Sequence, residues 1–528
     1  MKRRDFLLLS AGALAGCGLH PGVALRRNAP GMAEGHALRD IRSLPPPSAE
    51  IETDVVILGS GVAGLSAGWR LASQGYRDFL MVAGPEWHGN ASGALLGGTP
   101  CPLGAHYLPI PGPAATHVRD LLAQMGVIEQ GASALKPTYD ERCLIHAPEE
   151  RLYLNGQWHD GLIPPGNTSD ETAQIKRFFD YVHGLRGQAG SDGKRVFEIP
   201  SALSSQDPQW RALDQISFAQ WLDRQHYTAA PLRWYLDYAC RDDYGANSSR
   251  VSAWAGLHYF ASRNGAASNA DDDAVLTWPD GLNPLARHMA GRIGADRLLP
   301  GLAAHVTERN GRADVLVWQP QQRRTLRIRA RKAICAMPLH VAAHVVEPMR
   351  ALGFDTRDHM PAHAPWLVSN FVFDQFPAEA QGVPLAWDNV VYGSNSLGYV
   401  VATHQLIRAA RPERTVFTAY HALAEHTPEA GRRWLQQASD DALYTLASSD
   451  LAQVYGWKLW RNASRVDFTL RGHAMAVPGP GFLGNAGLAA LRAVDGAVQF
   501  AHADLSGFSI FEEAAWWGDV AATRLLQG

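Results

Sequence analysis

Hydrophobic and polar positions follow a strand–turn–helix–strand pattern that begins near residue 54. Residues 54–58 form a short apolar, β-branched run, which is typical of a buried parallel strand. An amphipathic pattern over residues 62–74 predicts a helix, and Gly75 is placed to end it. Residues 78–82 predict a second strand. This order indicates an α/β fold.

The turn between the first strand and the helix carries the motif Gly59-Ser60-Gly61-Val62-Ala63-Gly64. In this context the glycine spacing is typical of a dinucleotide-binding site. Gly59 would permit the tight turn, Gly61 would let the backbone approach a pyrophosphate, and Gly64 would let helix and strand pack closely. The helix N-terminus, with Ala63 in its first turn, would offer free N–H groups to the phosphates. We therefore predict dinucleotide binding here.

The ribose anchor of this motif is less clear. The second strand of such a unit normally ends in an acidic residue that holds the ribose hydroxyls. Here the strand ends Val82-Ala83-Gly84-Pro85, and Glu86 is the nearest acid. Either Glu86 takes this role or the anchor is absent; the pattern slightly favours Glu86.

Two later stretches add predicted strands. A strand is expected near His305-Val306, followed by a polar hairpin and an apolar run that ends at Pro338. Near the C-terminus, residues 497–501 predict a strand, His502-Ala503-Asp504-Leu505-Ser506-Gly507 follows it, and a helix is expected over about 510–526.

Four separated segments, spread over most of residues 51–528, resemble the flavin-containing amine oxidase and phytoene desaturase superfamily. The first is the glycine motif and the second is the Gly-rich stretch over residues 89–107. The third comprises residues 278–285 and 331–338, and the fourth is the C-terminal pattern. The resemblance implies FAD as cofactor. It also implies an α/β fold in which a Rossmann-like FAD-binding domain with a parallel sheet is interleaved with an α+β substrate domain. On this basis we expect FAD-domain parts at 51–112, 271–345 and 476–528, and substrate-domain parts at 113–270 and 346–475.

The resemblance also assigns cofactor contacts. Gly89 and Asn90 stand where the family's Gly-rich turn passes the pyrophosphate. The backbone at Val306 would meet the adenine. Asp504 would bond the ribityl chain, and the following backbone, with Ser506 and Gly507, would face the flavin pyrimidine edge.

Two departures from the family pattern leave the activity open. His88 precedes Gly89 where the family usually has Gly-Gly. Many amine oxidases carry a lysine that contacts flavin N5 through a water, and none of the six lysines in this chain has a matching context. The leading expectation is an FAD oxidoreductase that transfers hydride from an amine, such as a polyamine, or a similar small substrate to flavin N5. The alternatives are a desaturase or isomerase of the phytoene desaturase type and a binding lipoprotein without flavin.

Three further positions are candidates for the substrate site. Arg241-Asp242-Asp243-Tyr244-Gly245 is either a helix end with its charges in solvent or a polar wall of the substrate cavity. His473 precedes a Pro-Gly segment that in the family often faces the flavin, and it is the first catalytic candidate. His404 is the second, although a structural role is favoured for it.

Composition narrows the function classes. The chain has 528 residues, 46% hydrophobic and 19% charged, which excludes a disordered chain and a small disulfide scaffold. The formal charge of -3 gives no basic field for nucleic acid. Cys101, Cys143, Cys240 and Cys335 fit no metal motif, so no metal site is predicted and buried free thiols are expected.

The N-terminus is typical of an export signal. Arg3-Arg4 and the apolar run after Asp5 resemble a twin-arginine signal, and the run is too short to span a bilayer. Leu14-Ala15-Gly16-Cys17 resembles a lipobox, which predicts a lipid anchor on Cys17. Residues 1–17 are therefore interpreted as signal and 18–50 as a linker, with an ordinary signal peptide as the alternative. The expected partners are the twin-arginine export machinery, the periplasmic face of a bacterial membrane and a small-molecule substrate.

Overall fold

The structure is a computed structural model that describes residues 22–41, 43–271, 273–379, 382–407, 410 and 412–527. The predicted signal and lipobox at 1–17 lie outside the described residues. Within the described part of the chain, no helix has the length and apolar character needed to cross a membrane.

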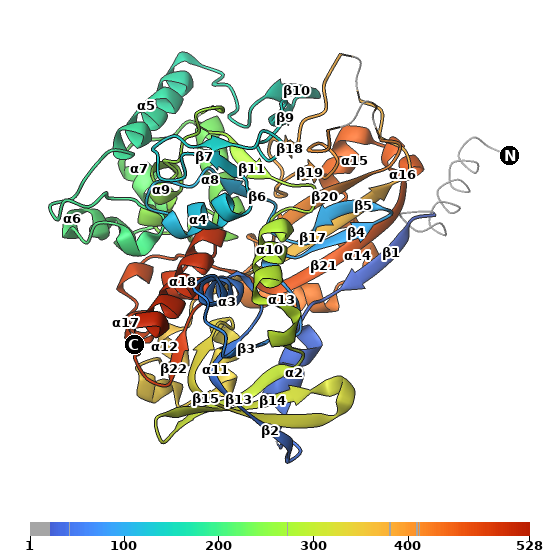
Figure 1. The fold of residues 1–528 in the computed structure, drawn as a ribbon. Coiled ribbons are helices and arrows are strands. Elements are labelled where there is room, and N and C mark those ends of the chain that lie inside the picture. The colour runs from blue at the N-terminus through green and yellow to red at the C-terminus, as the bar shows by residue number, and fades with distance from the viewer. Residues whose placement is uncertain are drawn as a thin grey trace.

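The first of two eight-stranded sheets is assembled from three distant stretches of chain (Figure 1). Parallel pairing joins β12, β3, β2, β15 and β22, so their carboxyl ends meet at one edge of the sheet. This arrangement confirms the predicted α/β fold, with a Rossmann-like domain interleaved with a second domain. The strands are β2 (Pro47–Leu58), β3 (Phe79–Val82), β12 (Leu298–Leu299), β13 (Leu302–Arg309), β14 (Arg312–Gln319), β15 (Arg324–Cys335), β16 (Val346–Glu347) and β22 (Val498–Phe500).

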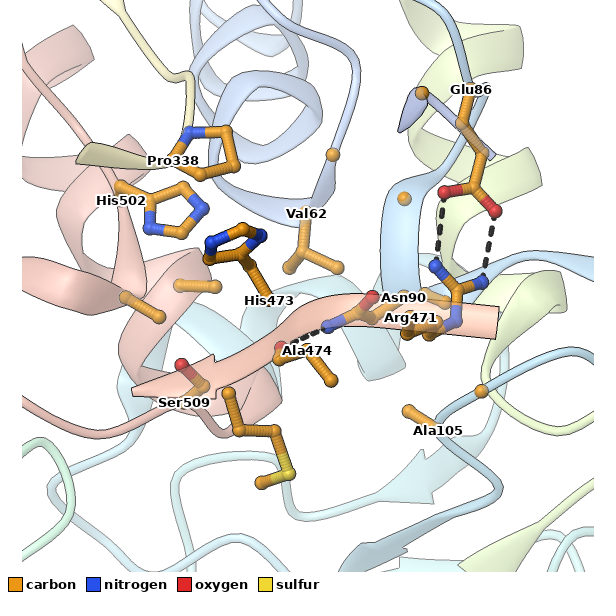
Figure 2. A pocket seen from close by; sticks show the side chains of 18 of the residues that line it. Val62, Glu86, Asn90, Ala105, Pro338, Arg471, His473, Ala474, His502 and Ser509 are labelled. Carbon is orange, nitrogen blue, oxygen red and sulfur yellow. Dashed lines mark hydrogen bonds and ion pairs between the residues drawn. The ribbon is translucent and has the colours of Figure 1, made fainter. Parts of the chain in front are cut away.

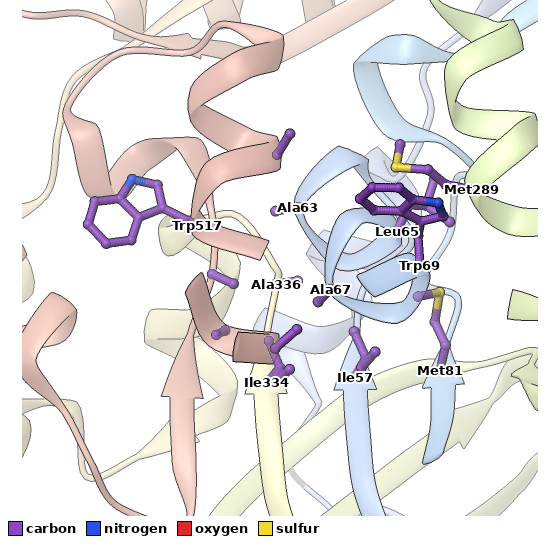
Figure 3. Packing of buried hydrophobic residues seen from close by; sticks show 14 of the residues in the cluster. Ile57, Ala63, Leu65, Ala67, Trp69, Met81, Met289, Ile334, Ala336 and Trp517 are labelled. Carbon is purple, nitrogen blue, oxygen red and sulfur yellow. The ribbon is translucent and has the colours of Figure 1, made fainter. Parts of the chain in front are cut away.

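Helix α3 (Val62–Ser73) covers this sheet and is flanked by α10 (Asn283–Ile293) and α18 (Phe511–Gln527). Figure 3 shows Ala63 and Ala67 of α3 lying above Ile57 and Ile334 of the strands. Small residues on the inner face of the helix let it approach the sheet closely, which fixes the turn that carries the glycine motif.

The second sheet runs in the order β1-β21-β17-β20-β19-β18-β9-β10. Its strands are β1 (Ala24–Asn28), β9 (Glu150–Leu154), β10 (Gln157–Asp160), β17 (His363–Phe373), β18 (Asp388–Val391), β19 (Tyr399–Val401), β20 (Thr415–Ala422) and β21 (Ala463–Ala476). Because side chains alternate along a strand, Leu367 of β17 packs in the cluster that includes Leu443, whereas Trp366 and Val368 face the other way. Helices α13 (Pro428–Gln437) and α14 (Asp440–Ala447) cover the face of the sheet on which Leu367 lies.

A helical group completes the second domain and lies beside this sheet (Figure 1). It includes α5 (Ser169–Leu185), α7 (Phe218–Arg224), α8 (Ala230–Tyr244) and α9 (Ala253–Ala261). The four cysteines from Cys101 onward are buried free thiols, as expected.

The segment interpreted as a linker requires a correction. Residues 24–28 form β1, which pairs in parallel with β21 at the edge of the second sheet. Residues 32–40 form helix α2 (Met32–Asp40), and β2 already begins at Pro47. The sequence pattern could not predict β1, because this strand pairs with a distant segment: Ala24 is the register partner of Arg465.

Candidate functional site

A cavity of about 680 Å³ lies between the carboxyl ends of the first sheet and the uncovered face of the second sheet. At one end it is lined by the glycine turn, the end of β3 and helix α2. At the other end it is lined by α8, the start of α18 and aromatic side chains of the second sheet. The cavity therefore joins both domains, and its size is in the range of ligand sites.

The three glycines of the motif differ in their backbone conformation and in the space around them. Gly59 has φ +113°, a conformation that favours glycine. A Cβ on Gly64 would lie 2.0 Å from the carbonyl oxygen of Gly59, so this position must stay small for α3 to pack on β2. A Cβ on Gly61 would meet no protein atom within 4 Å, because Gly61 faces the cavity.

The N-terminus of α3 also faces the cavity. Its N-cap residue, Gly61, offers no side chain to cap the first turn. Val62 and Ala63 line the cavity, so the free N–H groups and positive end of the helix are available to an anion. This geometry fits the pyrophosphate of a dinucleotide.

The turn at residues 88–90 holds a histidine in a left-handed backbone conformation. His88 has φ +67°, the left-handed region usually occupied by glycine, and its Nδ1 lies 2.7 Å from Asn283 Oδ1. Gly89 and Asn90 line the cavity, and the Asn90 amide donates a 2.7 Å hydrogen bond to the Ala474 carbonyl. His88 therefore takes a conformation that glycine adopts more readily.

Glu86 lies at the cavity wall but both its oxygens are engaged. Arg471 of β21 donates to them at 2.9 and 3.0 Å (Figure 2). The Ser92 hydroxyl also donates to Glu86, at 3.0 Å. The Arg471 side chain is 8% exposed and that of Glu86 is 20% exposed, so this ion pair is largely shielded from water. A ribose-binding role for Glu86 would compete with Arg471, and that role stays a prediction.

The expected adenine contact at Val306 is wrong. Val306 is fully buried and pairs with Val315 on one side and Val346 on the other, so its backbone is not available. Leu302 and Ala303 of the same strand line the cavity instead. Strand β16 pairs with β13 only from Val306 onward, which leaves the earlier edge of β13 open on that side.

The expected contacts at Asp504, Ser506 and Gly507 are also corrected, because none of these residues lines the cavity. The fully buried Asp504 carboxylate lies 3.1 Å from His363 Nε2 and 3.3 Å from His502 Nδ1. Burial alone would raise its pKa, but the two imidazoles together hold the pKa of Asp504 well below its usual range. Ser506 accepts a 2.7 Å hydrogen bond from the Trp517 indole.

The position before Asp504 reaches the cavity instead. His502 and Ala503 line the wall at this point, and Figure 2 shows His502 beside His473 and Pro338. His473 stacks on His340 with ring centroids 4.1 Å apart. Among the residues that the structure describes, no group of three or more His, Cys, Asp or Glu side chains could hold a metal ion.

Of the two histidines considered as catalytic candidates, only His473 lines the cavity. His473 lines the cavity, and burial lowers its pKa to about 3, so it is neutral at physiological pH and a weak base. His404 lies outside the cavity, and its Nε2 lies 2.7 Å from the His146 carbonyl oxygen. His404 is thus a structural histidine, and its placement as a catalytic residue is corrected.

Asp242 marks the far end of the cavity. Helix α8 ends at Gly245, as the sequence indicates, yet Asp242 and Asp243 line the cavity rather than facing solvent. Asp243 pairs with Arg263 at 2.6 Å, whereas Asp242 accepts a 3.2 Å hydrogen bond from the Tyr107 hydroxyl. Burial and the nearby charge of Asp243 raise the pKa of Asp242 to about 6.

Aromatic side chains surround Asp242, and sequence reasoning missed most of them as site residues. His106 stacks on Tyr420 with ring centroids 4.5 Å apart, and Tyr107 and Trp366 complete this wall. Burial lowers the pKa of His106 to about 3, so the ring is neutral. The position of His106-Tyr107 directly after the Gly-rich stretch was the available signal, but their facing partners lie on the second sheet.

Comparisons with known proteins agree with this architecture. Residues 57–125 match the family model of the NAD(P)-binding Rossmann-like domain. A structure of putrescine oxidase bound to putrescine superposes with a TM-score of 0.65 at 16% identity, over 91% of this chain and 100% of that chain. The chain has the fold of this oxidase.

Two other solved structures share the fold. Cyclohexylamine oxidase from Brevibacterium oxydans gives a TM-score of 0.61 at 18% identity, over 90% of this chain and 99% of that chain. A CLA-producing fatty acid isomerase from P. acnes gives 0.58 at 13% identity, over 89% and 98%. No curated protein sequence gives a significant match.

Proposed function

We propose that this protein is an FAD-dependent oxidoreductase of the amine oxidase-like type that oxidises a cationic amine. The observation that carries the proposal is one cavity with two different ends. A glycine cradle and an uncapped helix N-terminus form one end, and a carboxylate within an aromatic wall forms the other. When bound, FAD would accept a hydride from the carbon next to the substrate nitrogen.

The residues present fit the cofactor at its pyrophosphate. Gly59 and Gly61 shape the cradle, and Val62 and Ala63 present the helix N-terminus to it. Asn90 and His473 lie further along the wall, between this cradle and the aromatic end. The four buried cysteines lie away from the cavity, so a flavin there would be held without a cysteine bond.

Asp242 supports an amine as substrate. Of the two neighbouring aspartates, Asp243 is neutralised by Arg263, and Asp242 has only a neutral hydroxyl as hydrogen-bond donor. An ammonium group would supply the missing positive charge, and the faces of Tyr420 and Trp366 favour a cation. Asp242 would thereby orient the substrate, while the aromatic wall excludes water from the reacting carbon.

Two further acidic side chains lie near Asp242, outside the cavity wall. Asp388 of β18 and Glu150 of β9 are register partners across the sheet. Burial, together with nearby carboxylates, raises the pKa of Glu150 to about 7 and raises that of Asp388 well above its usual range. Because Asp242 also acts on the pKa of Asp388, the three groups are close enough to interact. Neither residue lines the cavity, and a raised pKa favours the uncharged carboxyl, so this pair gives no support for a second positive charge on the substrate.

The absence of a cavity lysine does not decide the reaction. None of the five lysines among the described residues lines the cavity, and Lys332 instead donates a 2.9 Å hydrogen bond to the Gly496 carbonyl. The fold is shared with a fatty acid isomerase, but an ionised Asp242 would repel a carboxylate substrate. The cavity chemistry therefore favours the amine over the fatty acid.

The test is reconstitution followed by a substrate panel. Purified protein is loaded with FAD, and bleaching of the flavin absorbance is followed without oxygen in the presence of monoamines, diamines, polyamines and unsaturated fatty acids. We expect bleaching by an amine and, with oxygen present, hydrogen peroxide. Fatty acid isomerisation with no response to any amine would favour the isomerase, and failure to take up FAD would favour a binding protein without flavin.

We further propose export as a lipoprotein anchored through Cys17 at the periplasmic face of a bacterial membrane. The support is the order of the twin-arginine and lipobox motifs in the sequence.

A further inference from the structure

Helix α2 lies against the cofactor end of the cavity. It follows β1, packs against α11 (Leu339–Val345), and precedes β2 of the first sheet (Figure 1). A Cβ on its N-cap residue, Gly31, would lie 3.1 Å from Pro85 Cγ, just after the end of β3. The end of this strand is where a Rossmann-type fold places the adenosine ribose.

One face of α2 looks onto the cavity. Gly31, Glu34, Gly35 and Leu38 recur at helical spacing, are half-buried and all line the cavity. Ala33, on the opposite face, is exposed and does not line it. No residue of α2 is fully buried, so this helix is held by few protein contacts of its own.

Glu34 is the acidic residue of α2 that lines the cavity, which the basic residues His36 and Arg39 of the same helix also line. Its carboxylate has no hydrogen-bond or ion-pair partner within the described residues, whereas Glu86, the acid expected from the sequence, is bonded twice by Arg471. Glu34 lies one turn along the helix from the Gly31–Pro85 contact. A carboxylate at this place can accept hydrogen bonds from two adjacent hydroxyl groups.

We propose that α2 closes over the adenosine half of the bound dinucleotide and that Glu34 accepts hydrogen bonds from the adenosine ribose hydroxyls. The inference rests on the proposed FAD function. It makes the N-terminal segment part of the cofactor site and gives the ribose contact to a residue outside the βαβ unit. Gly35 lets the ligand approach the helix backbone, since a Cβ there would meet no protein atom within 4 Å.

The experiment measures FAD dissociation constants of the full chain by quenching of flavin fluorescence. Glu34→Gln removes the charge, and Gly35→Leu adds a side chain whose Cβ would meet no protein atom within 4 Å. Ala37→Leu is the matched control, because Ala37 is exposed and does not line the cavity. Unfolding temperatures of the cofactor-free variants show whether each one remains folded.

We expect E34Q to raise the Kd for FAD by about 10-fold or more, the loss expected for hydrogen bonds to a charged group. G35L should raise the Kd by more than E34Q, and A37L should bind like the wild type. An FAD analogue with 2′-deoxyadenosine should weaken wild-type binding but add little to the loss in E34Q, which a merely structural role would not produce.

Each remaining outcome overturns a defined part of the argument. Unchanged binding by E34Q and G35L would show that α2 does not contact the cofactor. Tighter binding by either variant would show that α2 competes with FAD for the cavity. A wild-type protein that takes up no FAD would sink the proposed function itself.

Discussion

Asp242→Asn tests the substrate assignment most directly. The variant removes the negative charge at the aromatic end and keeps an oxygen that can accept the 3.2 Å hydrogen bond from Tyr107. Asp243 cannot substitute, because Arg263 pairs with it at 2.6 Å. A hydrogen bond to a charged partner contributes about 1.5–3 kcal/mol, which corresponds to roughly a 10- to 150-fold loss of kcat/KM for a cationic amine.

The assay is anaerobic flavin bleaching at a series of amine concentrations, with steady-state peroxide production as a second readout. D242N should raise the apparent Kd for the amine and leave the flavin spectrum unchanged. Asp180→Asn is the matched control, since Asp180 lies on α5 with a side chain 62% exposed. It should bind the amine like the wild type.

The pH dependence supplies an independent check. Because the pKa of Asp242 is raised to about 6, its carboxylate loses charge as pH falls through 6. Wild-type amine binding should weaken over that window, and D242N should lack this dependence. Burial makes the folded protein hold this proton more tightly than the unfolded chain, so ionisation lowers stability as pH rises from about 4 to about 6. D242N should therefore not lower Tm at pH 7.

Two results would refute the reasoning. The first is a D242N variant with unchanged amine affinity and unchanged pH dependence, which would place the cation elsewhere. The second is a D242N variant whose flavin content or Tm falls together with activity, which would give Asp242 a structural role instead.

Three further predictions concern the cofactor end and the N-terminus. Gly61→Val should lower flavin uptake more than tenfold and leave the Tm of the cofactor-free protein unchanged. Gly64→Ala should lower the unfolding free energy by about 1–3 kcal/mol in urea titrations, because its Cβ would lie 2.0 Å from the Gly59 carbonyl oxygen. Equal effects of the two variants would contradict the separate roles. Arg471→Met should lower the unfolding free energy by about 2–3 kcal/mol in the same titrations. This loss is smaller than for a fully buried ion pair because the Glu86 side chain is 20% exposed. Adding Glu86→Gln should restore most of the lost stability. Cys17→Ala should move the protein from the membrane fraction to the soluble periplasmic fraction, and retention in the membrane would disprove the lipid anchor.

The sequence predicted best where the chemistry is local. The glycine motif, its helix and its strands depend on neighbours within about 30 residues, and each occurs in the structure close to its predicted position. The need for glycine at positions 59 and 64 depends on local backbone geometry alone, so both structural roles could be predicted from the sequence. The positive φ of His88 could not be predicted, because histidine rarely adopts this backbone conformation.

Prediction failed where a role depends on a partner from a distant segment. Asp504 faces inward because His363, which is 141 positions away, reaches its carboxylate. Val306 lost its expected contact because β16 covers its free edge. The region 22–41 reads as a linker because β1 is short and polar, and its order comes from pairing with β21.

The distribution of paired carboxylates explains how one cavity can hold an anion and a cation at its two ends. An unpaired Glu86 near the glycine cradle would repel a pyrophosphate, and the bidentate contact from Arg471 removes that charge. The Asp504 carboxylate lies behind the cavity wall, 3.1 Å from His363 Nε2 and 3.3 Å from His502 Nδ1. At the far end the pairing is incomplete, because Arg263 pairs with Asp243 and leaves Asp242 with only the Tyr107 hydroxyl as a hydrogen-bond donor. The cavity is therefore suited to phosphates beside α3 and to a positive charge beside α8, and this polarity would orient substrate and cofactor relative to each other.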